Sequence, residues 1–145
     1  GGWIATYSEV CFAMAEANQR GWTTVGDTLT WLKLGIQASC ERWGVPSASA
    51  ASFAASATLG SNPMETIAMA KWTDMFLQGY EAWTEWRRLD FPVLSPPAAA
   101  ITGTGVPVRN GYGGLVPTQN KASYDAAVAA QGPDNQDTKL WWDTK

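Results

Sequence analysis

Side chains that could do chemistry are sparse in this 145-residue chain, which contains no histidine. This absence removes Ser-His-Asp and Cys-His catalysis, His-ligated metal sites and pH switching on imidazole. The two cysteines, Cys11 and Cys40, lack the C-x-x-C spacing of zinc and redox sites. We therefore expect no catalytic residue, no metal site, no cofactor and no enzyme activity.

Two groups of acidic residues could suggest chemistry. Glu81 and Glu85 lie four positions apart on one helical face, but a glycosidase pair needs a separation of about 5–9.5 Å and a cleft. We interpret them as charges on a solvated face. Asp134, Asn135 and Asp137 offer oxygen ligands, but they fall short of the spacing of a calcium loop and favour a turn.

Aromatic side chains are the best candidates for ligand contact, because the chain has nine tryptophans. Trp31 faces away from the main apolar stripe of its helix, so it either packs on a neighbouring element or offers an exposed platform. Tyr112 lies in a glycine-rich loop, where it either anchors the loop or contacts a ligand. Packing and anchoring are the favoured interpretations. These two residues are the candidate ligand-binding positions.

A helical hairpin is predicted to hold the first of these residues. Thr6 and Glu9 form a capping-box pattern before a helix over about residues 7–20. Asp27 is a suitable N-cap for a second helix over about residues 28–43. The short link between them predicts an antiparallel pair.

A long helix over about residues 63–89 should follow, after a Ser/Ala-rich stretch (47–60) that forms a short helix or a loop. Asn62 and Pro63 suit its start. We expect three tryptophans on one arc of this helix to face the core: Trp72, Trp83 and Trp86.

The remaining chain is less regular. Residues 92–119 are rich in glycine and proline and predict an irregular loop, followed by a short helix over about residues 121–131. The aromatic tail at Trp141 and Trp142 should wrap back and dock on the helical body. The predicted fold class is all-α: a TPR-like helical hairpin, a long helix, an irregular loop and a C-terminal wrap.

Cys11 and Cys40 fall on the buried stripes of the two hairpin helices. A disulfide and two buried thiols are both compatible with this placement, and the thiols are favoured.

Charge and hydropathy argue against nucleic acid as a partner and against a membrane-spanning helix. The formal net charge is −3, whereas nucleic-acid binding relies on a surplus of Lys and Arg. The longest apolar run, 10–15, is far shorter than the roughly 20 residues that cross a bilayer.

Several strings in the chain resemble the SusD/RagB family. Residues 7–22 are similar to its "Y-x-E-x-x-F-x-x-A-E-A … R-G-W" helix, and residues 35–39 to its "G-I-x-A-S". Residues 78–92 resemble its "Q-x-x-E-A-W-x-E-x-R-R-x-x-x-P". The ending, from Pro107-x-Arg109 to Leu140–Asp143, is similar to its C-terminal "P-x-R … W-W-D" signature. Residues 111–119 depart from the family pattern, because its Tyr-Pro and Glu are replaced there.

The resemblance implies that residues 1–145 are a single segment, the C-terminal part of a SusD-like domain with a TPR-like helical scaffold. It implies non-catalytic binding of an oligosaccharide or polysaccharide nutrient at the cell surface, and delivery to a TonB-dependent, SusC-like transporter of the outer membrane. A lipid anchor is expected on a preceding part of the protein. Besides glycan and transporter, the remainder of its own longer chain is an expected partner. The alternative is a TPR-like scaffold that binds peptide.

Overall fold

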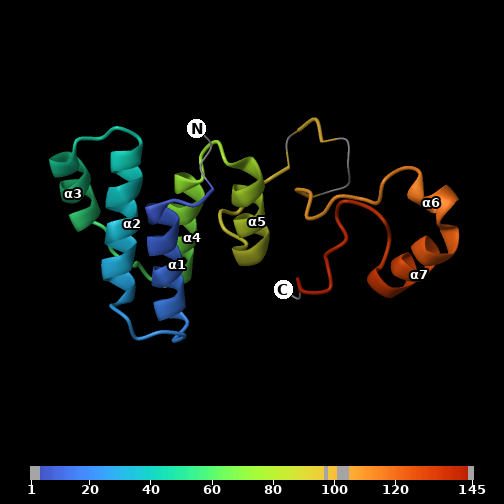
Figure 1. Ribbon diagram of the computed structural model, residues 1–145, viewed down its shortest axis with the longest axis horizontal. Coiled ribbons are helices and arrows are strands. Elements are labelled where there is room, and N and C mark those ends of the chain that lie inside the picture. The colour runs from blue at the N-terminus through green and yellow to red at the C-terminus, as the bar shows by residue number, and fades with distance from the viewer. Residues whose placement is uncertain (1–3, 97, 101–104, 144–145) are drawn as a thin grey trace. The chain divides into compact units, whose positions relative to one another are not determined.

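The computed structural model describes residues 4–96, 98–100 and 105–143, and it divides the chain into two compact units. The first unit runs to Pro92 and the second begins at Val93 (Figure 1).

The described residues form helices and no strands, which confirms the all-α prediction. The first unit contains α1 (Tyr7–Gln19), α2 (Thr28–Arg42), α3 (Ser47–Ala55), α4 (Pro63–Asp74) and α5 (Gly79–Leu89). The second unit contains α6 (Val116–Gln119) and α7 (Lys121–Gln131).

The helical hairpin of α1 and α2 forms as its caps predict. The Thr6 side chain accepts from the Glu9 amide, and the Glu9 carboxylate accepts from the Thr6 amide, so the capping box is complete. The Asp27 carboxylate accepts from the Thr30 hydroxyl and from the Thr30 amide at 3.0 Å, and these bonds lower the pKa of Asp27. The two helices lie side by side (Figure 1).

A glycine sets how closely these two helices approach. A Cβ atom at Gly35 of α2 would lie 2.6 Å from the ring of Phe12 on α1. The Phe12 ring therefore occupies the space that a side chain at position 35 would need. Phe12 belongs to the buried core cluster, together with Ala15, Leu32 and Ile67.

The prediction of one long helix over residues 63–89 is wrong, because the chain breaks between α4 and α5. Leu77 adopts φ 69° in this break, and Gly79 begins α5. The break lets Lys71 reach Glu85 at 3.0 Å. In a continuous helix these residues would be about 21 Å apart along the axis. Ion pairing across the turn is thus available only to the broken form.

The break also changes the expected tryptophan arc. Trp72 lies on α4, whereas Trp83 and Trp86 lie on α5, and all three are half-buried. Trp86 donates its indole N–H to the Pro92 carbonyl at 3.0 Å, and Arg87 lies over the Trp83 ring at 3.9 Å. The three indoles therefore do not form one buried stripe.

The other elements refine the expectations. The Ser/Ala-rich stretch forms the short helix α3, and α7 covers the predicted residues 121–131. The one-turn helix α6, inside the loop predicted over residues 92–119, was not anticipated. Cys11 and Cys40 are both free, the first buried and the second half-buried. Burial raises the pKa of the Cys11 thiol.

The C-terminal tail is less covered than expected. Trp141 is 83% exposed and Trp142 is 40% exposed, so neither indole has the burial that a docked aromatic tail would give it. Docking of the tail on the helical scaffold stays a prediction. Across the described residues, no helix combines the length and the apolar character needed to cross a membrane.

Candidate binding site

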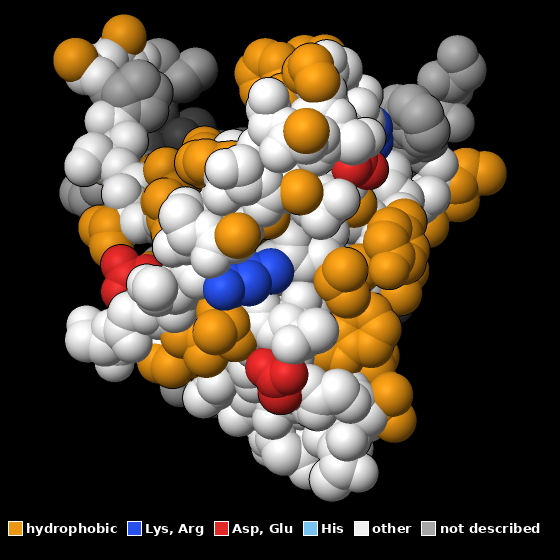
Figure 2. Space-filling model, turned by 90° about the vertical axis from the view of Figure 1, so that its left-hand side faces the viewer, with side chains coloured by type: hydrophobic (Ala, Val, Ile, Leu, Met, Phe, Trp, Pro, Cys, Tyr) orange, Lys and Arg blue, Asp and Glu red, His pale blue; other side chains and the backbone are white. Residues whose placement is uncertain are grey.

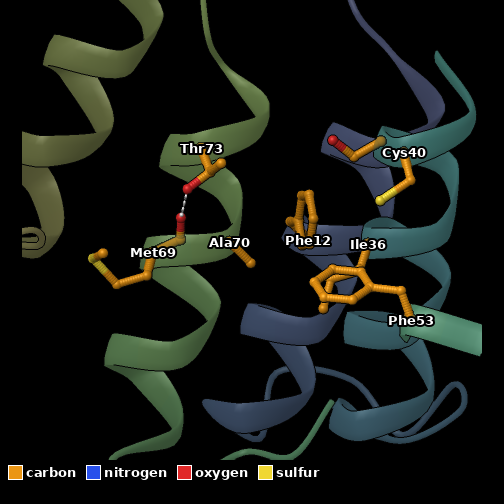
Figure 3. A pocket seen from close by; sticks show the side chains of 8 residues that line it. Phe12, Ile36, Cys40, Phe53, Met69, Ala70 and Thr73 are labelled. Atoms are coloured by element: carbon orange, nitrogen blue, oxygen red, sulfur yellow. Dashed lines mark hydrogen bonds between the residues drawn. The ribbon is translucent and has the colours of Figure 1, made fainter. Parts of the chain in front are cut away.

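An apolar groove of about 290 Å³ lies on the first unit. It is on the side of the molecule where α3 lies, a side on which charged side chains are sparse (Figure 2). The groove runs between α2 and α4, with a floor from α1 and a lip from α3 (Figure 3). It is lined by Phe12, Ile36, Ser39, Cys40, Phe53, Met69, Ala70 and Thr73.

The chemistry of this groove is that of an apolar contact surface. None of its lining residues carries a charge. The hydroxyl of Thr73 donates to the Met69 carbonyl at 2.8 Å, which is a bond within α4. The groove is therefore suited to apolar side chains and offers little for hydrogen-bonded recognition.

The carboxylate of Glu16 is held in ion pairs with two arginines. The buried carboxylate of Glu16 on α1 accepts from Arg88 on α5 and from Arg20. Burial of Glu16 by itself raises the pKa, but the bonds from Arg88 and Arg20 outweigh it and lower the pKa to about 2. The same bonds to Glu16, followed by those to Glu85, raise the pKa of Arg88. Glu16 is thus a structural anion.

A second buried ion pair links three helices. Asp74 at the end of α4 accepts from the Ser8 hydroxyl of α1 at 2.8 Å and from Arg42 of α2 at 2.6 Å. The side chains of Ser8, Arg42 and Asp74 thus join α1, α2 and α4. This arrangement fixes the helices that wall the groove.

The expectation that Glu81 and Glu85 share a solvated face is correct only for Glu81. The side chain of Glu85 is 15% exposed and pairs with Lys71 and Arg88. The reason is the break before α5, which turns this face of the helix toward α4. Among the described residues, no group of three or more Cys, Asp or Glu could hold a metal ion.

Trp31, a candidate from the sequence, packs against its own hairpin. Its indole N–H donates to the Val25 carbonyl at 2.7 Å, and a Cβ at Gly26 would lie 2.6 Å from the same nitrogen. The ring also packs against the core cluster. Trp31 thus makes packing contacts within the first unit, and ligand contact by this residue stays a prediction.

Tyr112, the other candidate, sits in an anchored loop of the second unit. Its amide donates to Asp134 at 3.1 Å, and its ring meets Tyr124 edge to face at 5.7 Å between centroids. The Arg109 guanidinium lies 5.3 Å from the Tyr112 centroid and pairs with Asp134 at 3.0 Å. The ring remains partly exposed.

Asp134 organises this loop, a role that sequence reasoning missed. Besides Arg109 and Tyr112, it accepts from the Tyr124 hydroxyl at 3.3 Å. Burial and then the charge of Asp134 raise the pKa of Tyr124. Asn135 accepts from the amides of Asp137 and Thr138, so the acidic stretch forms the predicted turn. The sequence feature that could have pointed to this role of Asp134 is Arg109, because a buried arginine needs an acidic partner.

The two candidates belong to different units of the chain. Trp31 belongs to the first unit and Tyr112 to the second. Each makes its described contacts within its own unit.

The fold is shared with solved SusD-like structures. "Bacteroidetes AC2a SusD-like" is 29% identical, with a TM-score of 0.85, over 99% of this chain and 31% of that one. A chitin-binding protein is also 29% identical, with a TM-score of 0.85, over 96% of this chain and 33% of that one. A chitin-binding SusD homologue from Flavobacterium johnsoniae is 25% identical, with a TM-score of 0.76, over 95% and 36%.

The chain thus spans about a third of the length of the solved structures it matches. None of the curated proteins compared with the chain matches it. The family described as SusD-like_2, starch-binding associating with outer membrane, matches residues 2–113, which is most of the chain. The chain therefore belongs to the SusD-like family.

Proposed function

We propose that this chain is the C-terminal part of a protein that binds oligosaccharide or polysaccharide nutrient at the cell surface. SusD-like proteins are non-catalytic carbohydrate-binding proteins. The observation that carries the proposal is the family match over residues 2–113. Chitin-binding relatives with the same fold at 29% and 25% identity support it.

The protein delivers its glycan to a TonB-dependent, SusC-like transporter, and it is held at the outer membrane by a lipid anchor on a preceding part. The family description, which associates its members with the outer membrane, supports this location. The described part of this chain contributes a scaffold, because its buried charges are paired between helices.

Glycan affinity of the natural protein that carries this sequence tests the proposal. Calorimetric titration with chitooligosaccharides and, separately, maltooligosaccharides should give saturable binding to one of them. The proposal would be overturned if the protein bound neither oligosaccharide and also bound nothing in a wider polysaccharide panel tested by affinity electrophoresis. Delivery to a transporter is tested by deleting the gene of this protein in its own bacterium. The deletion strain should lose growth on the glycan that the protein binds.

The candidate contact Tyr112 can be tested in the same assay. If the exposed Tyr112 ring stacks on a sugar, Tyr112→Ala lowers affinity, because aromatic faces bind apolar sugar faces. Tyr80, an exposed tyrosine on α5, provides the matched control Tyr80→Ala. Equal affinity of both variants assigns Tyr112 to loop anchoring.

A second candidate function is a TPR-like scaffold that binds peptide. The apolar groove between α2 and α4 favours it, because amphipathic helices bind in such grooves. An amphipathic helical peptide that binds the natural protein while no glycan does would favour this alternative.

A further inference from the structure

The groove between α2 and α4 leaves large apolar side chains in water. Phe53, on the α3 lip, is 65% exposed, and Met69, on the α4 wall, is 38% exposed. Phe53 and Ile36 line this same groove, and the Cys40 thiol points into it (Figure 3). Aromatic and long apolar side chains gain most from burial, so an open groove of this kind is an incomplete packing surface.

A saccharide is a poor match for this groove. Sugar hydroxyls need several hydrogen-bond partners, whereas the lining offers the hydroxyls of Ser39 and Thr73, and the latter already donates to a carbonyl. A helix with an apolar face requires none of these bonds. Such a helix buries its side chains between two flanking helices, as in helix-in-groove recognition.

The rest of a longer SusD-like chain is a source of such a helix. Solved structures superpose on 99% and 96% of this chain with TM-scores of 0.85, yet the chain covers only 31% and 33% of them. In those proteins this fold is therefore one third of a larger body. A surface that is open in this third has the remaining two thirds available to cover it.

We propose that the groove between α2, α3 and α4 is an internal interface, which seats an apolar helix face from the rest of a longer SusD-like chain. The proposal rests on the proposed function in one respect, namely that this chain is part of a longer protein. It assigns Phe53 and Met69 to packing between the parts of that protein, away from glycan and transporter.

Cys40 reports directly on this interface, because it lines the groove and is half-buried in this chain. In the natural protein under native conditions, alkylation of Cys40, followed by peptide mass spectrometry, should be about 100-fold slower than in denaturant, since access then requires local opening. Cys11, which is fully buried in the core, is the internal reference for protection. Alkylation of Cys40 at nearly the denatured rate, in protein whose Cys11 is protected, would overturn the proposal.

Charged variants give an independent readout. Phe53→Glu in the natural protein should lower the melting temperature clearly, although this side chain is mostly exposed in the chain described here. Val25→Glu, in the exposed link between α1 and α2, is the matched control and should leave the melting temperature nearly unchanged. Equal and small effects of both substitutions would contradict the proposal.

The same samples separate other occupants. Protection of Cys40 that appears only on adding glycan assigns the groove to ligand, and protection that appears only with rising protein concentration assigns it to a second copy. Both outcomes overturn the proposal. Glycan affinity, measured on the same samples, tests the proposed function. The two tests are independent, because the protein can bind glycan whether the groove is open or covered.

Discussion

Glu16 illustrates how single residues hold this fold. Its carboxylate is buried on α1 and receives bonds from Arg20 on the same helix and from Arg88 on α5. Removing one partner of such a group leaves a buried charge without compensation. The residue therefore couples the first helix of the unit to its last one.

The pH dependence of unfolding should report this group. The pKa of Glu16 is lowered from 4.5 to about 2 in the folded protein, so the unfolded chain takes up the proton first as pH falls. Its stabilisation is complete above about pH 4.5 and is lost as pH falls toward 2. The shift corresponds to about 3 kcal/mol. We expect about 2 kcal/mol, because Arg88 is one-third exposed and water screens the pair.

Denaturant unfolding of Glu16→Gln and of the parent between pH 7 and pH 2 checks this. The variant should be less stable at pH 7 and should lose less stability on acidification. Glu81→Gln, which removes an exposed carboxylate on α5, should retain the acid loss of the parent. Identical pH profiles for Glu16→Gln and the parent would refute the assignment.

At the scale of elements, the break between α4 and α5 is the feature that sequence periodicity failed to show. Leu77 holds a left-handed backbone conformation there and is 80% exposed, so its side chain gains little from burial. A left-handed conformation costs a non-glycine residue about 1–2 kcal/mol. That cost is offset by contacts that the break makes available, such as the pair of Lys71 and Glu85.

Leu77→Gly should therefore stabilise the protein by about 0.5–1 kcal/mol, once the entropy cost of glycine is subtracted. Leu77→Ala is the control, because it removes the same side chain but keeps the backbone penalty. Thermal melts of both variants measure the difference. A lower melting temperature for Leu77→Gly than for Leu77→Ala would show that the break carries no such strain.

The contact between α1 and α2 gives a second prediction at this scale. Gly35→Ala places a methyl group against the buried Phe12 ring, and we expect a loss of about 1–3 kcal/mol. Gly79→Ala has open space for its methyl group and should be neutral or slightly stabilising. Chemical denaturation of both variants provides the comparison. Equal stability of the two would mean that the helices separate at little cost.

At the scale of the whole molecule, exposed apolar side chains set the behaviour of the isolated chain. Phe53 and Met69 at the groove, together with Phe76 and Trp141 elsewhere, all contact water. Large exposed apolar patches bind dyes and promote association. The 145-residue chain produced alone should therefore bind ANS strongly or aggregate.

Dye fluorescence and light scattering of that chain, beside a folded monomeric protein of similar size, measure this. A monodisperse preparation with no dye response beyond the control would contradict the expectation. In that case the groove would be stable in water, and its proposed role as an internal interface would lose its physical basis.

The sequence by itself determined the helices whose ends carry local signals. The Thr6 and Glu9 capping box, Asp27 and Asn62 all bond to amides within three residues of themselves, so their effect can be predicted without tertiary contacts. The family strings likewise indicated the SusD-like family, to which the chain belongs. The turn at Asp134–Asp137 followed from local preferences as well.

Only the tertiary structure decided the break at Leu77, the burial of Glu85 and the role of Asp134. These features depend on ion pairs between residues that are distant in sequence. Lys71 pairs with Glu85 across the break, Arg88 of α5 pairs with Glu16 of α1, and Arg109 pairs with Asp134. Helical periodicity is continuous through residues 63–89, so the pattern alone predicts a single helix. Propensity measures only the local backbone preference and does not include contacts between distant residues. Ion pairs and packing between helices add free energy that no local pattern contains, and they override propensity where the two conflict.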